Sequence, residues 1–261
     1  MTEIVRSELK TMLNRVYTQT LVGLILCGVC AGATIGFVPA TLAQTEHQVL
    51  TAQQKQTLIQ RSEEIIKLAS QGDFVTPLNY LAPEVKAYVT PALFQRIWET
   101  ELIAQTGAFE SIVSSKIIDV INADIVTLTL KFAQRSEAID FTFNKSQELV
   151  GITLPSSLSL DEISEAFVAD LNKGDYGSAR GYLNPLFKAE IFAEKLETEW
   201  QNELKSYGKF QKVVDVKVKP GSSLNAPDVA IVTLAFENET RDYFFFFDNN
   251  RKIVNLDFVT D

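Results

Sequence analysis

Apolar residues follow helical spacing in some segments of the chain and alternate with polar residues in others. Helical spacing is clearest between Leu58 and Ala69 and again between Ile163 and Leu171. Downstream of the first segment the period changes to two, as between Val126 and Phe132 and between Ile139 and Phe143. The pattern therefore predicts helices followed by strands, and the second helical segment starts the same order again.

The predicted helices have recognisable ends. Ser159, followed three residues later by Glu162, forms a capping box, and Gly174 is suited to end the helix that begins there. Thr90 and Pro91 supply an N-cap and a first helical residue for a later helix. With a short helix around Pro77 to Tyr80, and its counterpart around Ser178 to Leu183, each half is expected to hold about three helices before four strands.

Short motifs recur in the same order in the two halves of the chain. Gly72-Asp73-Phe74 returns as Gly174-Asp175-Tyr176, and Gly107-Ala108-Phe109 returns as Gly208-Lys209-Phe210. The two tryptophans, Trp98 and Trp200, fall in register with these motifs. We predict two copies of one α+β domain, residues 46–155 and 156–261, in which helices cover one face of an antiparallel sheet.

The recurring features resemble a known superfamily. They are the Gly-Asp-aromatic turn, the tryptophan on the third helix, the Gly-x-Phe entry into the sheet, and a last strand of the type Lys252 to Leu256. This combination resembles the nuclear-transport-factor-2-like superfamily and, within it, an uncharacterised bacterial domain family whose members are often exported. The resemblance covers nearly all of the mature chain, twice. It implies two tandem cone-shaped domains, in which a curved sheet wraps the long helix and the mouth can hold a small molecule. Members include enzymes, ligand binders and dimerisation modules, so the resemblance predicts the fold rather than the activity.

Residues 1–43 have the pattern of a secretory signal. No charged residue lies between Arg15 and Glu46, most residues from Thr20 to Val38 are apolar, and Thr41 and Ala43 are small residues before a cleavage site. We expect export to a periplasm, a lumen or the extracellular space after cleavage. The alternative is an uncleaved anchor, which would be the protein's one contact with a membrane.

The composition excludes several classes of function. The chain carries 24 basic and 33 acidic side chains, a net charge of −9, which argues against a nucleic-acid partner. Cys27 and Cys30 both fall in the predicted signal, and the one histidine, His47, lies in the tail just after it. These residues assemble neither a nucleophilic triad nor a metal site. We therefore predict no catalytic residue, no metal and no cofactor, with a carboxylate-based lyase, isomerase or hydrolase as the less favoured alternative.

Four aromatic residues are the candidates for a ligand pocket. Trp98 and Trp200 hold equivalent positions in the two copies, and Tyr80 and Tyr182 lie near them in the pattern. These side chains are suited to line a pocket for a small apolar ligand. The alternative, which the apolar neighbours of both tryptophans favour, is that each indole fills the core of its cone.

The outward faces of the two predicted sheets differ. In the first copy this face is polar and suited to contact with water, with the series Thr127, Thr129, Lys131, Asp140 and Thr142. In the second copy the matching series is Ile231, Thr233, Ala235, Phe244 and Phe246. A sheet that is apolar on both faces needs a cover on each face. We predict a contact surface at Ile231, Ala235, Phe244 and Phe246, covered by the first copy, a second chain or another protein. The sequence thus favours an exported, non-catalytic binding or interaction module, with a small-molecule binder as the alternative.

Overall fold

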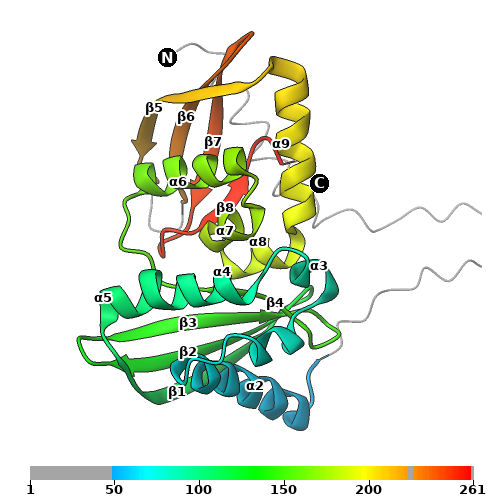
Figure 1. Ribbon diagram of the computed structural model, residues 1–261, viewed down its shortest axis with the longest axis vertical. Helices are drawn as coiled ribbons and strands as arrows, with labels where there is room; N and C mark the ends of the chain where they lie inside the picture. The colour runs from blue at the N-terminus through cyan, green and yellow to red at the C-terminus, as the bar shows by residue number, and fades with distance from the viewer. Residues whose placement is uncertain (1–48, 223–225, 260–261) are drawn as a thin grey trace, which may run out of the picture. The chain divides into compact units, whose positions relative to one another are not determined.

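The computed structural model describes residues 49–222 and 226–259 (Figure 1). The predicted signal segment, its two cysteines and His47 lie outside these ranges. Within the described ranges no helix has the length and apolar character that crossing a membrane requires.

The first repeat places its helices before its sheet. The helices are α2 (Ala52–Ser70), η1 (Thr76–Tyr80), α3 (Pro83–Lys86), α4 (Pro91–Arg96), η2 (Ile97–Ile103) and α5 (Ala104–Thr106). The strands are β1 (Phe109–Asp119), β2 (Asp124–Phe132), β3 (Ser136–Phe143) and β4 (Leu149–Thr153). α4, η2 and α5 follow one another without a break, and η2 is a π-helical stretch. As predicted, Thr90 caps α4, because its hydroxyl accepts the amide of Leu93 at 3.1 Å, and Pro91 is the first helical residue.

The second repeat has the same order of elements. Its helices are α6 (Leu160–Lys173), α7 (Tyr176–Ala179), η3 (Arg180–Tyr182), α8 (Pro185–Glu190) and α9 (Ala193–Tyr207). Its strands are β5 (Phe210–Lys219), β6 (Asp228–Phe236), β7 (Thr240–Phe247) and β8 (Ile253–Leu256). The predicted capping box of Ser159 and Glu162 starts α6, and Gly174 ends it with a left-handed φ of 75°.

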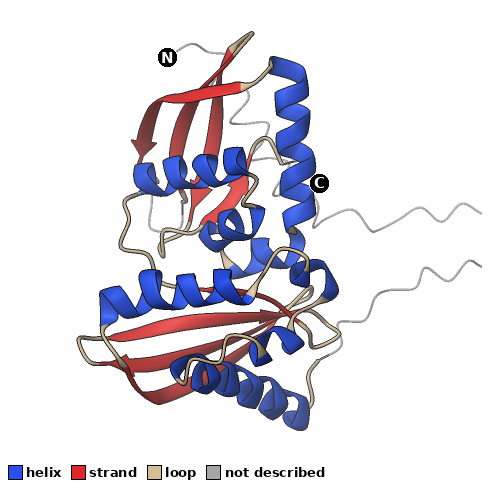
Figure 2. Ribbon diagram, in the orientation of Figure 1, coloured by secondary structure: helices blue, strands red, loops and turns tan. Residues whose placement is uncertain are grey.

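The two sheets have the same topology and the same irregularities. Each is antiparallel with its strands in chain order, β1-β2-β3-β4 and β5-β6-β7-β8 (Figure 1). Figure 2 shows the strands of both sheets in red and the helices beside them in blue. The register shift between Thr142 and Phe143 returns between Phe246 and Phe247, and β1 and β5 carry matching shifts as well. Shared bulges confirm the α+β fold and the duplication that the sequence predicts.

Each repeat has its own hydrophobic core. In the first repeat α2 packs on β1 and β2, and in the second α6 packs on β5 and β6. Buried residues of the helices and of the inner sheet faces form one cluster in each repeat. The described residues of the two repeats nevertheless form a single compact unit, because the second repeat also contacts the first.

The sequence analysis missed helix α8, which joins the repeats. α8 packs on β3 and β4 of the first sheet, although it belongs to the second repeat. Its six residues are too few for an amphipathic stripe. A local signal was present, because Asn184 and Pro185 are an N-cap and a first helical residue, and Asn184 accepts the amide of Phe187 at 2.7 Å.

The expectation that water covers the outer face of the first sheet was wrong at Thr142. This side chain is fully buried, and its hydroxyl lacks a hydrogen-bond partner among the residues that the structure describes. The reason is α8: Gly151 pairs with Thr142, and the side chain of Lys188 lies directly against Gly151. Asp140 does lie on the outer face as predicted, where it accepts a 2.6 Å hydrogen bond from Thr127.

Candidate functional site

A cavity of about 110 Å³ opens in the cone of the first repeat and extends to the second. Most of its lining is apolar and comes from α2, η1, α3, α4, η2, β3 and β4. The lining residues of the first repeat are Ile65, Ile66, Pro77, Leu78, Leu81, Val85, Val89, Leu93, Phe94, Ile97, Trp98, Ile139, Leu149, Gly151, Ile152 and Leu154. The second repeat contributes Gly177, Arg180, Gly181 and Lys188.

One of the four aromatic pocket candidates, Trp98, lines this cavity. Tyr80 is not part of the lining, and its hydroxyl donates to Glu64 at 2.6 Å. Tyr182 packs on Phe167 in the second repeat, and Trp200 is buried in the second core. The structure therefore brings none of the other three candidates to the cavity.

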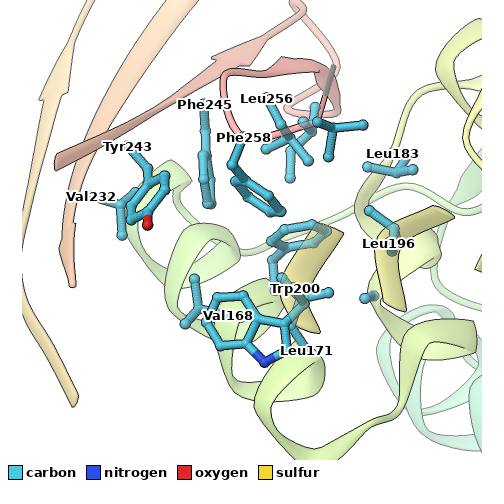
Figure 3. Packing of buried hydrophobic residues seen from close by; sticks show 14 of the residues in the cluster. Val168, Leu171, Leu183, Leu196, Trp200, Val232, Tyr243, Phe245, Leu256 and Phe258 are labelled. Atoms are coloured by element: carbon cyan, nitrogen blue, oxygen red, sulfur yellow. The ribbon is translucent and has the colours of Figure 1, made fainter. Parts of the chain in front are cut away.

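The matching cone of the second repeat is filled with aromatic rings. Trp200 is 1% exposed and lies 6.4 Å from the ring of Phe258, measured between centroids. Phe258 also packs on Tyr243 and Phe245, at 5.6 and 6.3 Å (Figure 3). The indole of Trp200 is therefore part of the core of the second repeat.

Leu154 is the counterpart of Phe258 in the first repeat. Ile152 pairs with Phe141 as Leu256 pairs with Phe245, and Leu154 and Phe258 each lie two residues further along the chain. Leu154 lines the cavity, whereas Phe258 belongs to the core cluster. The same architecture therefore has an open cone in one repeat and a plugged cone in the other.

Arg180 forms part of the polar end of the cavity. The residue is 5% exposed. Its Nε donates to the carbonyl oxygen of Ile191 at 2.9 Å, and its Nη2 donates to those of Val150 and Lys188 at 2.9 and 2.7 Å. Burial lowers the pKa of Arg180 to about 10, so the guanidinium stays charged at neutral pH. Among the described residues, Nη1 has no hydrogen-bond partner.

Lys188 forms the rest of this polar end. The residue is 2% exposed, and its Nζ donates to the carbonyl oxygen of Ile152 at 2.7 Å and to the hydroxyl of Thr153 at 2.8 Å. Burial lowers the pKa of Lys188 well below its usual value, and the nearby charges of Lys252 and Arg180 lower it further. The amine is thus held by one backbone carbonyl oxygen and one hydroxyl, both uncharged, and not by a carboxylate.

The buried cations lack close anionic partners. Arg180, Lys188 and Lys252 are all buried, and none of them forms an ion pair within 4 Å with a described carboxylate. Burial lowers the pKa of Lys252 to about 8. Glu101, the acid whose charge acts most on Lys252, pairs instead with Arg96 at 3.5 Å. A buried charge without an ion-pair partner lowers the stability of the folded state by several kcal/mol, on the order of 3–5 kcal/mol.

Arg180 had a signal in the sequence, but Lys188 had none. The repeat aligns Arg180 with Leu78, so a cation replaces an apolar residue inside a matched motif. Lys188 aligns with Lys86, which is an exposed helix residue in the first repeat. In the described part of the chain, no cluster of His, Cys, Asp or Glu could hold a metal ion.

The predicted contact residues lie on the outer face of the second sheet. Ile231 pairs with Phe244, and both are half-buried, as is Phe246. Ala235 is 9% exposed. The main contacts between the repeats run instead from α8, η3 and α9 to β3, β4 and α3. The first repeat is therefore not the main cover of this face, although the sequence left that open.

A family described as Protein of unknown function (DUF3887) matches the chain twice, at residues 62–152 and 164–256. Each match lies in one repeat, and together they cover more than half of the chain. No curated protein matches the chain.

Proposed function

We propose a ligand-binding function for this protein, which belongs to the family described as Protein of unknown function (DUF3887) and carries two copies of its domain. The ligand is a small, largely apolar molecule, and its site is the cavity of the first repeat. The observation that carries the proposal is the contrast between the open first cone and the plugged second cone.

An empty apolar cavity is costly to keep. At about 24 cal/mol per Å³, the coefficient for an enclosed cavity, 110 Å³ corresponds to at most about 2–3 kcal/mol of stability, since this cavity is partly open. In the second repeat the ring of Phe258 occupies part of the core at the equivalent position. A cavity of this order of size and lining also binds small apolar molecules in other proteins. Keeping the first cone open is consistent with selection for a ligand.

The proposed binding is non-catalytic. Arg180 and Lys188 are the charged residues among the lining side chains, and no described carboxylate or histidine lines the cavity beside them. An acid–base pair within reach of a bound molecule, the usual requirement for proton transfer, is therefore not formed by these side chains.

The test exchanges the residues that distinguish the cones. Leu154→Phe introduces the plug of the second repeat, and the matched control, Phe258→Leu, removes it from the repeat that is not proposed to bind. The probe is N-phenylnaphthylamine, a neutral apolar dye whose fluorescence rises on leaving water. We expect the wild type and Phe258→Leu to bind the dye and Leu154→Phe to lose binding. Equal binding by the Leu154→Phe variant, with a native circular dichroism spectrum, would overturn the proposal.

A second function is supported by the outer face of the second sheet. Ile231, Phe244 and Phe246 form an apolar centre, and the rim carries both Lys217 and Asp242. A face with charges of both signs is suited to pack against a copy of itself around a two-fold axis. We therefore propose self-association through this face, with a separate protein as the alternative outcome. A stable contact needs about 800 Å² on each side.

We also propose that the protein belongs to the nuclear-transport-factor-2-like superfamily and that it is exported. The order of helices and then a four-stranded antiparallel sheet, repeated twice, supports the first. The charge-free, mostly apolar run between Arg15 and Glu46 supports the second. Expression of the full chain, followed by N-terminal sequencing of the secreted product, tests export: a new N-terminus at Gln44 is expected, and intracellular retention would contradict it.

A further inference from the structure

We infer that the ligand of the cavity is an amphiphilic carboxylate, with its apolar chain inside the first cone and its carboxylate bound by Arg180 and Lys188. This inference rests on the proposed function and adds the chemical class of the ligand. It follows from where the polar groups of the cavity lie, from their unused hydrogen-bond donors and from their charge.

The polar side chains lie together on one side of the cavity. Arg180 belongs to η3 and Lys188 to α8, and the carbonyl oxygen of Lys188 accepts a hydrogen bond from Arg180. Both side chains reach the carbonyl oxygens of β4, at Val150 and Ile152. The first repeat supplies the apolar lining and the second repeat supplies the cations. A molecule that fits both parts has one apolar end and one polar end.

Both cations keep donors for a ligand. A guanidinium has five N–H donors, and Nη1 carries two of them without a partner among the described residues. Arg180 lines the cavity, and Nη1 is not among the fully buried side-chain atoms without a partner, which in the described ranges belong to Asp124, Thr142 and Asp257. Lys188 Nζ has three N–H donors once it is protonated, and two of them are used, so the proton taken up on binding supplies the third.

The charge of the site favours an anion. Arg180, which stays charged at neutral pH, has no ion-pair partner in the described part of the chain, and the buried amines of Lys188 and Lys252 lie near it. An alkyl amine would meet like charges, and an alcohol would leave the charge uncompensated. A carboxylate compensates it with one planar group, which matches the guanidinium. A dianionic phosphate is less suited, because the carbonyl oxygens of Val150 and Ile152 lie beside the same cations.

Binding should be linked to a proton. Burial lowers the pKa of Lys188 in the free protein. A bound carboxylate would raise that pKa again, because an adjacent negative charge stabilises the protonated amine. Between the pKa of Lys188 in the free protein and its higher pKa in the complex, binding therefore takes up a proton. The affinity for the carboxylate should fall as the pH rises through this range.

The experiment compares three probes of equal chain length, octanoate, octanol and octylamine, by titration calorimetry of the full chain. We expect octanoate to bind at least about 10-fold more tightly than octanol, because its carboxylate forms charge-assisted hydrogen bonds. Octylamine should bind most weakly. Lys188→Met should bring the affinity for octanoate down to that for octanol measured on the same variant. Lys173→Met, the matched control, removes an exposed lysine outside the cavity and should change neither affinity.

The outcomes separate this inference from the proposed function. If octanol and N-phenylnaphthylamine bind but octanoate binds no more tightly than octanol, the carboxylate is overturned and the apolar site stands. If neither the neutral dye nor any of the three probes binds, both fall. Should Lys188→Met fail to fold, proton uptake by the wild type decides: calorimetry of octanoate in two buffers of different ionisation enthalpy should give different apparent enthalpies. Equal apparent enthalpies across the pH range would overturn the linkage to Lys188 and with it the carboxylate.

Discussion

Leu154 and Phe258 occupy equivalent positions in the two repeats, yet Leu154 lines a cavity and Phe258 fills a core. The larger ring packs on Trp200, Tyr243 and Phe245. The smaller side chain leaves the space beside Trp98 open. The first repeat, which has the smaller Leu154, has a cavity, and the second repeat, which has the larger Phe258, has a filled core.

This relationship predicts opposite changes in stability. Leu154→Phe should raise the free energy of unfolding by about 0.5–2 kcal/mol, the range for filling a cavity without strain. Phe258→Leu should lower it by about 1–3 kcal/mol, because the lost ring leaves a void. Urea unfolding monitored by circular dichroism measures both. A loss of stability in Leu154→Phe would show that the cavity cannot accept the plug.

Two glycines near the cavity should respond differently to alanine. A Cβ on Gly177 would lie 2.6 Å from the backbone oxygen of Tyr88, in the other repeat, so the repeats would have to shift. A Cβ on Gly181 meets nothing within 4 Å. We expect Gly177→Ala to lower the free energy of unfolding by about 1–3 kcal/mol and Gly181→Ala to change it by less than about 0.5 kcal/mol. Urea unfolding measures both changes. If the two variants lose the same free energy of unfolding, the close approach of Gly177 to the backbone of Tyr88 is contradicted.

Charges on the outer face of the second sheet should abolish self-association. In Phe244→Asp and Phe246→Asp, the buried contact would hold carboxylates without partners, and the complex should dissociate. Sedimentation velocity of the full chain should show a dimer for the wild type and a monomer for each variant. Val113→Asp, which removes an exposed apolar residue of the first repeat, is the control and should remain dimeric. A monomeric wild type would instead point to a separate protein on this face.

The carboxyl group of Asp257 predicts a pH dependence of stability. Burial raises the pKa of Asp257 from 3.8 to about 6 in the folded protein. Between these values the folded state binds more protons than the unfolded state, so the contribution of Asp257 to stability falls as the pH rises. Asp257→Asn should therefore be more stable than the wild type at pH 7 by about 1 kcal/mol, and the gain should shrink toward pH 4. Urea unfolding at several pH values measures the difference, and a gain that is independent of pH would exclude this cause.

The local sequence predicted much of the fold because its signals act over a few residues. The capping box of Ser159 and Glu162, and the N-cap of Thr90, identify helix starts from neighbours in the chain. The alternation between Ile139 and Phe143 places buried side chains on one face of a strand, and the register of β3 agrees. The repeat likewise made Trp98 a candidate, and the structure has it both in the core cluster of the first repeat and in the lining of the cavity.

The sequence by itself determined the duplication, the helix ends and the order of helices and strands, because capping and periodicity depend on residues close together in the chain. Tertiary structure alone decided that α8 packs on the first sheet, that Thr142 is buried and that Lys188 reaches the cavity. Lys188 and Lys86 are the same residue type at matching positions, yet one is buried and the other exposed. Burial depends on which distant segment packs against a side chain, and no local pattern encodes that.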